Sequence, residues 1–273
     1  MSKFVQGFKK IIYGYIPFYY AKVFNPQSAS LPYYKYVIDY HNSHHLFLFR
    51  HEYEMMEIKI EKDKASGLPY VYLPHPNSKK RLFFSKQMTH EAIKKLFMTL
   101  LMEQDHRSPH RYFDHIEEFK DKVLLDVGAA EGILSLMAIE QVKHVYLFEC
   151  SEDWIDALNK TFEPWKDKVT IIKKFVSDKD DENNVSLDTF FKDKPQNNLF
   201  LKMDIEGMER KALSGCRQMF ANAGNVSFAI CTYHRKDDLS VISSFLNTYH
   251  CKYTNQTGFF AHRLKSVLLR GTN

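Results

Sequence analysis

A pair of glycines and a pair of carboxylates in the middle of the sequence could hold a nucleoside. Asp126 comes two residues before Gly128, Gly132 follows after three intervening residues, and Glu149 lies further along the chain. Small residues let a ligand approach a loop backbone closely, and free N–H groups at a helix start favour a carboxylate or a phosphate. An acid at the end of the next strand can accept hydrogen bonds from the hydroxyls of a ribose. The spacing therefore predicts a nucleoside pocket.

The glycine pattern also distinguishes between two nucleoside cofactors. A dinucleotide-binding loop typically has the pattern G-x-G-x-x-G, because its glycines admit a pyrophosphate. In this chain Ala130 takes the place of the middle glycine, and Asp126 would lie near the negative pyrophosphate. The same carboxylate suits the cationic amino-acid end of S-adenosylmethionine, which we therefore predict as the cofactor. For the glycine loop alone, a strand–helix turn that binds no ligand remains an alternative.

Three later side chains could act on the acceptor of a methyl transfer. Asp204 and Glu206 follow the apolar run 199–203, and His234 follows the apolar run 228–231. Holding the acceptor in line with the methyl group can supply roughly 7–11 kcal/mol of the barrier, and a general base adds about 10²–10⁴-fold. His234 is the first candidate for this base, because an unperturbed imidazole titrates at about pH 6.5. Asp204 and Glu206 are the other candidates, and a structural role stays open for all three.

A polar segment before the glycine loop is predicted to border the site. Residues 103–112 carry acids, histidines, arginines and a tyrosine, and Pro109 prevents a continuous helix there. His110 and Arg111 are candidates for binding the acceptor, since a guanidinium suits a carboxylated or phosphorylated group. A solvated linker is the alternative interpretation. Two carboxylates near the site could also hold a divalent metal, but no partner ligands are visible in the sequence, so no metal is predicted.

A parallel sheet would bring these residues to one edge. The apolar runs 123–127 and 145–148 predict two buried strands, and 133–141 predicts the helix between them. Strands and helices continue to alternate, which predicts an α/β fold with a doubly wound, mostly parallel sheet. An antiparallel pair of strands over 251–270 would close it, and the loop 175–178 would border the adenine. The predicted cofactor-binding residues are Asp126, Gly128, Ala129, Ala130, Gly132, Glu149, Cys150, Val176, Ser177, Asp178 and Asp204.

The N-terminal part of the chain has a different character. We predict an extension with helices and strands over residues 1–115 and a cofactor-binding domain over residues 116–273. Residues 1–24 are rich in aromatic side chains and lysines, as in an interfacial segment whose rings lie among lipid headgroups. The alternatives are that these rings cover the catalytic domain or line a contact within a homo-oligomer. The uncharged piece 11–21 is far short of the roughly 20 residues that a membrane-spanning helix needs.

Local patterns predict several elements within this extension. Residues 55–62 alternate like a strand, 69–73 and 81–84 predict a small β unit, and Thr89 begins a helix. The histidine cluster 41–45 suggests a metal site, but no acid or cysteine is placed to complete the ligand shell. Surface or packed histidines are therefore the favoured interpretation.

The composition limits the choice of partners and compartment. The net charge is only +5 and the basic residues are dispersed along the chain, so we expect no nucleic acid as a partner. A saccharide or another small molecule stays open as the acceptor. Four cysteines stand far apart without a C-x-x-C pair, which is typical of reduced thiols in a cytoplasmic protein. We therefore expect the protein in the cytoplasm, at the inner face of the membrane if residues 1–24 bind lipid.

Two motifs give the chain a resemblance to the FkbM family of methyltransferases. The first is LDVGAAEGILSL, residues 125–136, and the second is LKMDIEGMERKALSG, residues 201–215. The second motif is similar to the family pattern K-x-D-x-E-G-x-E-x-x-x-L-x-G at all of its fixed positions. The usual asparagine after the alanine of the glycine loop is absent, since Ala130 and Glu131 stand there.

The resemblance implies both a fold and an activity. The fold would be the Rossmann-like, seven-stranded sheet of class I methyltransferases. The activity would be O-methylation of a sugar hydroxyl by S-adenosylmethionine, because EQDHRSPHRY, TYHRKDDL and the aromatic N-terminal region look like bacterial members that act on cell-surface or secreted glycans. N- or O-methylation of a small molecule or peptide stays open, as does a non-catalytic membrane-peripheral module with the same fold.

Overall fold

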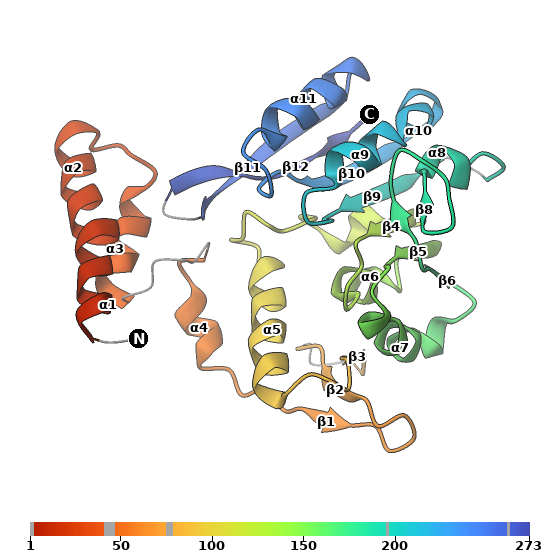
Figure 1. The fold of residues 1–273 in the computed structure, drawn as a ribbon, viewed down its shortest axis with the longest axis horizontal. Helices are drawn as coiled ribbons and strands as arrows, with labels where there is room; N and C mark the ends of the chain where they lie inside the picture. Colours follow the sequence, from red (N-terminus) through yellow and green to blue (C-terminus); the bar gives the residue numbers. More distant parts are fainter. Residues whose placement is uncertain (1–2, 41–46, 75–78, 195–196, 261–262) are drawn as a thin grey trace.

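The protein is described by a computed structural model, which covers residues 3–40, 47–74, 79–194, 197–260 and 263–273. The histidine cluster 41–45 lies outside the described residues. In Figure 1 the helices nearest the N-terminus stand to one side of the main body. They lie next to the tip of the C-terminal pair of strands.

A seven-stranded sheet forms the centre of the main body, as the resemblance predicted. In chain order its strands are β4 (Val123–Val127), β5 (His144–Phe148), β6 (Val169–Ile172), β9 (Leu199–Met203), β10 (Val226–Cys231), β11 (Lys252–Phe260) and β12 (Arg263–Thr272). They are arranged in the order β11-β12-β10-β9-β4-β5-β6, and β12 alone among them runs against the others. This order places β4 between β9 and β5 (Figure 1), so the residues after these three strands meet at one edge.

Helices cover both faces of this sheet because neighbouring strand residues point to opposite sides. Leu124 packs in one apolar cluster with residues of one group of three helices. Leu125 packs in a second cluster with residues of another group of four helices. The first group is α5 (His90–Glu103), α6 (Ile133–Ala138) and α7 (Glu152–Thr161). The second group is α8 (Leu187–Phe190), α9 (Glu209–Ser214), α10 (Arg217–Asn222) and α11 (Asp238–Thr248). The doubly wound arrangement is thus confirmed.

The connections contain four short elements. These are the 3₁₀ turns η2 (Ile116–Phe119) and η3 (Glu163–Trp165), and the strands β7 (Phe175–Val176) and β8 (Asn184–Val185), which pair in parallel. The β7–β8 pair follows β6, so it fixes the loop that was predicted to border the adenine.

The N-terminal extension contains both helices and strands. Its elements are α1 (Lys3–Lys10), the π-helical turn η1 (Ile11–Tyr15), α2 (Ile16–Phe24), α3 (Leu31–Tyr40), α4 (Arg50–Glu54), β1 (Glu61–Lys62), β2 (Pro69–Tyr72) and β3 (Arg81–Phe83). Helix α3 reaches the main body through Tyr33, whose ring stacks on Phe259 of β11 with centroids 4.9 Å apart. No described helix is both long and apolar enough to cross a membrane.

The local predictions in the extension have mixed outcomes. The helix after Thr89 is confirmed, and the Thr89 hydroxyl caps it by accepting a hydrogen bond from the N–H of Ala92 at 3.2 Å. The small β unit is also confirmed. The strand over 55–62 is wrong except for Glu61 and Lys62, since only these two residues pair with β2. The alternation before them reflects packing instead, because Ile58 lies against the core.

Candidate active site

The glycine loop makes a tight turn between β4 and α6. Gly128, Ala130 and Gly132 have φ angles of 77°, 45° and 78°, in the left-handed region that favours glycine. A Cβ atom on Gly128 would lie 2.1 Å from the backbone oxygen of Asp204, so no larger residue fits there. This close approach brings the start of the loop and the end of β9 together.

Hydrogen bonds from the loop backbone tie it to the end of β5. The N–H groups of Gly128 and Ala129 donate to the carbonyl oxygen of Phe148 at 3.0 and 3.1 Å. The N–H of Ala130 donates to the Glu149 carboxylate at 2.8 Å. These three N–H groups therefore hold the loop in place and are not available to a ligand.

A cavity of about 750 Å³ lies over the C-terminal ends of β4, β5 and β9. This volume is typical of sites for small molecules and cofactors. The end of α5 contributes Leu100, Glu103 and Gln104 to the wall, so residues on both sides of the predicted boundary at 115/116 form it. Of the predicted cofactor-binding residues, Gly132 and Asp178 lie outside the wall. Those that line it are Asp126, Gly128, Ala129, Ala130, Glu149, Cys150, Val176, Ser177 and Asp204.

Glu149 presents a fixed carboxylate to one side of the cavity. One of its oxygens accepts the N–H of Ala130, and the other accepts the N–H of Ser151 at 2.7 Å. The side chain is 9% exposed. Because a carboxylate has about four acceptor positions, Glu149 can accept further hydrogen bonds from a ligand. We call this part of the wall, with Cys150, Val176 and Ser177, the Glu149 side.

Asp126 is engaged by the protein itself, which the sequence did not indicate. Its carboxylate lies 3.1 Å from the ammonium nitrogen of Lys202 and accepts the hydroxyl of Ser135 at 2.7 Å. Lys202 also donates to the carbonyl oxygen of Gly128. Burial disfavours the charged lysine, but Asp126 and Asp204 outweigh it and raise the pKa of Lys202. A buried, charged lysine therefore lies beneath the glycine loop.

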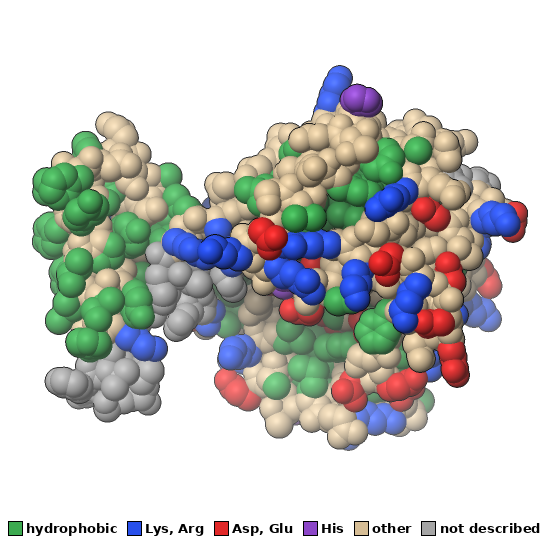
Figure 2. All heavy atoms as spheres, turned by 45° about the horizontal axis from the view of Figure 1, so that its top comes forward, with side chains coloured by type: hydrophobic (Ala, Val, Ile, Leu, Met, Phe, Trp, Pro, Cys, Tyr) green, Lys and Arg blue, Asp and Glu red, His purple; other side chains and the backbone are tan. Residues whose placement is uncertain are grey.

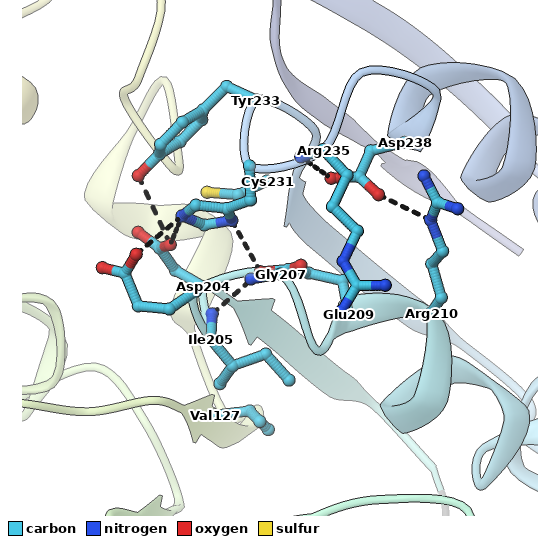
Figure 3. Close-up of polar contacts among 12 residues, drawn as sticks. Val127, Asp204, Ile205, Gly207, Glu209, Arg210, Cys231, Tyr233, Arg235 and Asp238 are labelled. Atoms are coloured by element: carbon cyan, nitrogen blue, oxygen red, sulfur yellow. Dashed lines mark hydrogen bonds and ion pairs between the residues drawn. The ribbon is translucent and has the colours of Figure 1, made fainter.

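Asp204 forms the opposite side of the cavity and is held by side chains. Its carboxylate accepts the hydroxyls of Tyr112 at 2.9 Å and Tyr233 at 3.4 Å, and Figure 3 shows the Tyr233 hydroxyl pointing at it. Burial acts to raise the pKa of Asp204, but the nearby His110, Lys202 and other partners lower it below its usual value. Asp204 is therefore ionised at neutral pH.

His234 lies behind Asp204 and does not line the cavity. Its Nε2 atom is 3.5 Å from carboxylate oxygens of Asp204 and of Glu206, and its Nδ1 is 2.9 Å from Glu209. Burial acts to lower the pKa of His234, but Glu209 and the other acids raise it above its usual value. The side chain of Glu206 is 92% exposed at the cavity rim. Of the three candidate bases, Asp204 and Glu206 face the cavity.

Glu209 contacts His234 behind the cavity, and the sequence indicates it only through the second motif. It is fully buried at the start of α9, and its carboxylate accepts the N–H groups of Ile205 and Gly207 at 3.0 and 3.3 Å (Figure 3). The same oxygen lies next to His234. Glu209 therefore fixes both the loop after β9 and the orientation of the imidazole.

Neither predicted acceptor-binding residue lines the cavity. His110 is buried, with its Nε2 atom 3.3 Å from the Tyr233 hydroxyl and 3.6 Å from the Asp204 carboxylate. Burial lowers the pKa of His110 and leaves it neutral. The guanidinium of Arg111 lies 5.0 Å from the centre of the Phe113 ring. His110 thus supports Asp204 from behind, and the role of both residues in acceptor binding stays a prediction.

Two acids and an amide in the wall were not among the predicted site residues. Burial and repulsion from Asp204 and Glu131 raise the pKa of Glu103 to about 8. Burial also raises the pKa of Glu131 to about 7. The side chain of Gln104 is 7% exposed, and neither its oxygen nor its nitrogen has a hydrogen-bond partner among the described residues. We call Glu103, Gln104, Glu131 and Asp204 together the Asp204 side of the cavity.

Two groups of side chains among the described residues have the composition of a metal site. They are His110, Asp204 and Cys231, and Asp204, Glu209 and His234, with the ligand atoms of each group within 4.8 Å of one another. Burial raises the pKa of the Cys231 thiol well above its usual value, which disfavours the thiolate that a metal needs. One carboxylate oxygen of Glu209 already accepts two backbone N–H groups. In the second group His234 pairs with the carboxylates of Asp204 and Glu209, and we assign no metal to either group.

Comparison with known proteins identifies the family. Residues 19–249 match the family described as the Methyltransferase FkbM domain. Among solved structures, the chain is similar to a methyltransferase FkbM from Methylobacillus flagellatus KT, with 18% identity and a TM-score of 0.46 over 67% of this chain and 55% of that one. It is also similar to SMU.1697c of Streptococcus mutans in complex with SAH, with 13% identity and a TM-score of 0.40 over 57% of this chain and 93% of that one.

The curated relatives match only a short segment. A stretch of 58 residues is 47% identical to protein arginine N-methyltransferase 1 of Oryza sativa, in both the indica and japonica subspecies. It covers 20% of this chain and 15% of the length of those relatives. The FkbM domain, by contrast, matches most of the chain. The protein therefore belongs to the FkbM family of methyltransferases and has the class I, Rossmann-like fold.

Proposed function

We propose that the cavity binds S-adenosylmethionine with its ribose at Glu149 and its methionine part toward Asp204. The remaining acceptor capacity of the Glu149 carboxylate suits the ribose hydroxyls. Val176, a buried apolar residue in the loop after β6, would pack against the adenine. The cationic sulfonium and ammonium would face Glu131 and Asp204. The donor set of the wall thus fits each chemical part of this cofactor.

We propose that the acceptor is a sugar hydroxyl, and the observation that carries this is the buried amide of Gln104. An unpartnered polar group in a protein interior costs about 1–3 kcal/mol. A hydroxyl both donates and accepts, so a polyhydroxyl acceptor would supply partners for both amide atoms. Glu103 lies next to it in the wall and, with a pKa of about 8, can donate or accept a hydrogen bond near neutral pH.

In this proposal Asp204 is the residue that takes the proton from the acceptor. When bound, S-adenosylmethionine supplies a methyl group on a positive sulfur, which leaves as a neutral thioether. Asp204 would accept the hydrogen bond of the acceptor hydroxyl and receive its proton late, as the oxygen bonds to the methyl carbon. Its lowered pKa makes it a weak base, which suffices for a proton that leaves late. His234 and Glu209 would hold Asp204 from behind.

A second candidate function is methylation of an amine or guanidinium in a small molecule or peptide. Glu103 is close enough to Glu131 and Asp204 for repulsion between them to raise its pKa. A cationic acceptor would relieve this repulsion. The match to an arginine N-methyltransferase covers only a short segment, so it does not decide between the two acceptors.

The test is a transfer assay with S-adenosylmethionine that carries an isotopically labelled methyl group. One panel contains neutral and charged saccharides, the other contains amines and arginine peptides, and mass spectrometry locates the label. Labelling of sugars by the wild type would support the proposal if Asp204→Asn abolishes it and Asp193→Asn, at an exposed position, does not. Labelled peptides with unlabelled sugars would establish the second candidate. Bound cofactor without transfer in either panel would favour the non-catalytic module.

We propose the cytoplasm as the compartment in which the enzyme works. All four of its cysteines are free thiols, and Cys216, Cys231 and Cys251 are buried. Reduced thiols of this kind are typical of cytoplasmic proteins. Cell fractionation with an antibody to the native protein would test this placement.

A further inference from the structure

The N-terminal helices carry the whole net charge of the chain. Residues 1–38 contain five lysines and no acidic residue, and the net charge of the entire chain is +5. Acidic and basic residues therefore balance in the remaining sequence, which includes the cavity. An electrostatic partner of this protein would be attracted to the N-terminal segment first.

Along α1, η1 and α2, two small residues lie on the side that packs against α3. Gly14 and Ala21 are buried on the inner side, and a Cβ atom on Gly14 would lie 2.9 Å from the side chain of Ile38. The outer side has large apolar residues that are between 51% and 72% exposed. We call this surface the apolar helix face, and its main residues are Phe8, Ile11, Ile16, Tyr20, Val23 and Phe24. Figure 2 shows its green side chains covering the N-terminal helices.

Lysines lie against aromatic rings on these same helices. The ammonium of Lys10 lies 5.6 Å from the centre of the Tyr15 ring, and that of Lys22 lies 5.9 Å from the Phe18 ring. A lysine stem that follows an apolar ring keeps its charge at the edge of the apolar surface. This arrangement matches a membrane interface, in which rings enter the headgroup layer and ammonium groups meet phosphates.

Charge decides between the two occupants that an apolar helix face could have. A second copy of the chain would form a symmetric contact and bring two acid-free, lysine-bearing segments together. An anionic lipid surface offers the opposite charge. We propose that the apolar helix face binds the surface of a bilayer containing anionic lipid, with α1, η1 and α2 lying in the plane of the headgroups. This inference is independent of the acceptor and of the cofactor.

The experiment measures binding of the full chain to lipid vesicles by co-flotation at low salt. The probes are vesicles of phosphatidylcholine alone and vesicles with added phosphatidylglycerol. We expect binding to the anionic vesicles and a loss of at least 100-fold in the double variant Ile16→Asp and Val23→Asp. The control is Met55→Asp, because Met55 is an apolar residue that is 85% exposed and lies outside the apolar helix face. Equal melting temperatures would show that both variants are folded.

A second variant separates charge from apolar contact. Lys9→Gln, Lys10→Gln and Lys22→Gln together should weaken binding on the order of 100-fold, since each lysine near an anionic surface contributes about fivefold. The matched control changes Lys86, Lys94 and Lys95, which are exposed elsewhere, to glutamine. Failure of the wild type to float with anionic vesicles would overturn the proposal. So would light scattering that shows a dimer which the Ile16→Asp and Val23→Asp variant dissociates, without any vesicle binding.

Discussion

The two sides of the cavity hold their carboxylates by different means. Glu149 is fixed by two backbone N–H groups. One belongs to Ser151, two residues along the chain, and the other to Ala130 in the glycine loop. Asp204 is held by side chains, and one of them, Tyr112, lies 92 residues away in the chain. Acids with raised pKa values and an unpartnered amide lie only on the Asp204 side of the described wall. The protein itself thus fixes the carboxylate of the Glu149 side before a ligand binds. The Asp204 side, in contrast, has buried polar groups whose hydrogen bonds a ligand would complete.

The largest effect is expected on the Asp204 side. Asp204→Asn should lower kcat on the order of 10²–10⁴-fold, because a general base contributes about that much. Binding of S-adenosylhomocysteine should weaken by only about tenfold, because Asp204 is one of two carboxylates that would face its ammonium. Initial rates and calorimetry would measure both quantities, with Asp193→Asn as the control at an exposed position. A variant that keeps wild-type kcat would remove Asp204 from the proton transfer.

The Glu149 side should instead affect cofactor binding. Glu149→Ala should weaken S-adenosylhomocysteine binding at least tenfold, since each hydrogen bond to a charged group is worth about 1.5–3 kcal/mol. Calorimetry gives the dissociation constant directly. The control is Glu152→Ala, because the side chain of Glu152 is 79% exposed and three residues away. Equal affinity of the Glu149 variant and the wild type would show that the ribose does not bind at this carboxylate.

The raised pKa of Glu103 predicts a pH dependence of stability. The folded state keeps this proton between the ordinary glutamate pKa of 4.5 and about 8, while the unfolded state loses it. The free energy of unfolding should therefore fall as pH rises through this window. Glu103→Gln should remove most of that fall, on the order of 4 kcal/mol between pH 5 and pH 8.

Urea unfolding at pH 5 and pH 8 would measure the Glu103 effect, with the exposed Glu117→Gln as the control. If wild type and Glu103→Gln lose the same stability between the two pH values, the pKa of Glu103 is not raised in the folded protein.

The smallest effect concerns the glycine loop that joins the two sides. Ala130 has a φ angle of 45°, where an L-residue is strained and glycine is not. Ala130→Gly should raise the free energy of unfolding by about 0.5 kcal/mol, after the entropy cost of glycine. The control Ala157→Gly in the middle of α7 should lower it by about 1 kcal/mol. A loss of stability with both substitutions would contradict the strain at Ala130.

On the Glu149 side the sequence predicts the strands and the loop correctly, because their signals are local. The glycine spacing and the two apolar runs lie within a few turns of chain, and the structure places Glu149 at the end of β5 as expected. The Asp204 side joins the end of α5, the segment around residue 112 and the ends of β9 and β10. No local pattern shows that Glu103 and Gln104 meet Asp204, or that Lys202 would pair with Asp126. His234 was ranked first as the base because of its chemistry, whereas the packing of β10 beside β9 places it behind Asp204.

The most direct test of the account is the melting temperature with S-adenosylhomocysteine, with NAD as the comparison ligand. At about 100 times its dissociation constant a ligand adds about 2.7 kcal/mol to the stability. In a protein of this size that corresponds to a rise of roughly 5–10 °C. We predict this rise with S-adenosylhomocysteine and none with NAD. A rise with NAD alone would contradict the assignment of the cavity to S-adenosylmethionine. So would the absence of a rise with both ligands.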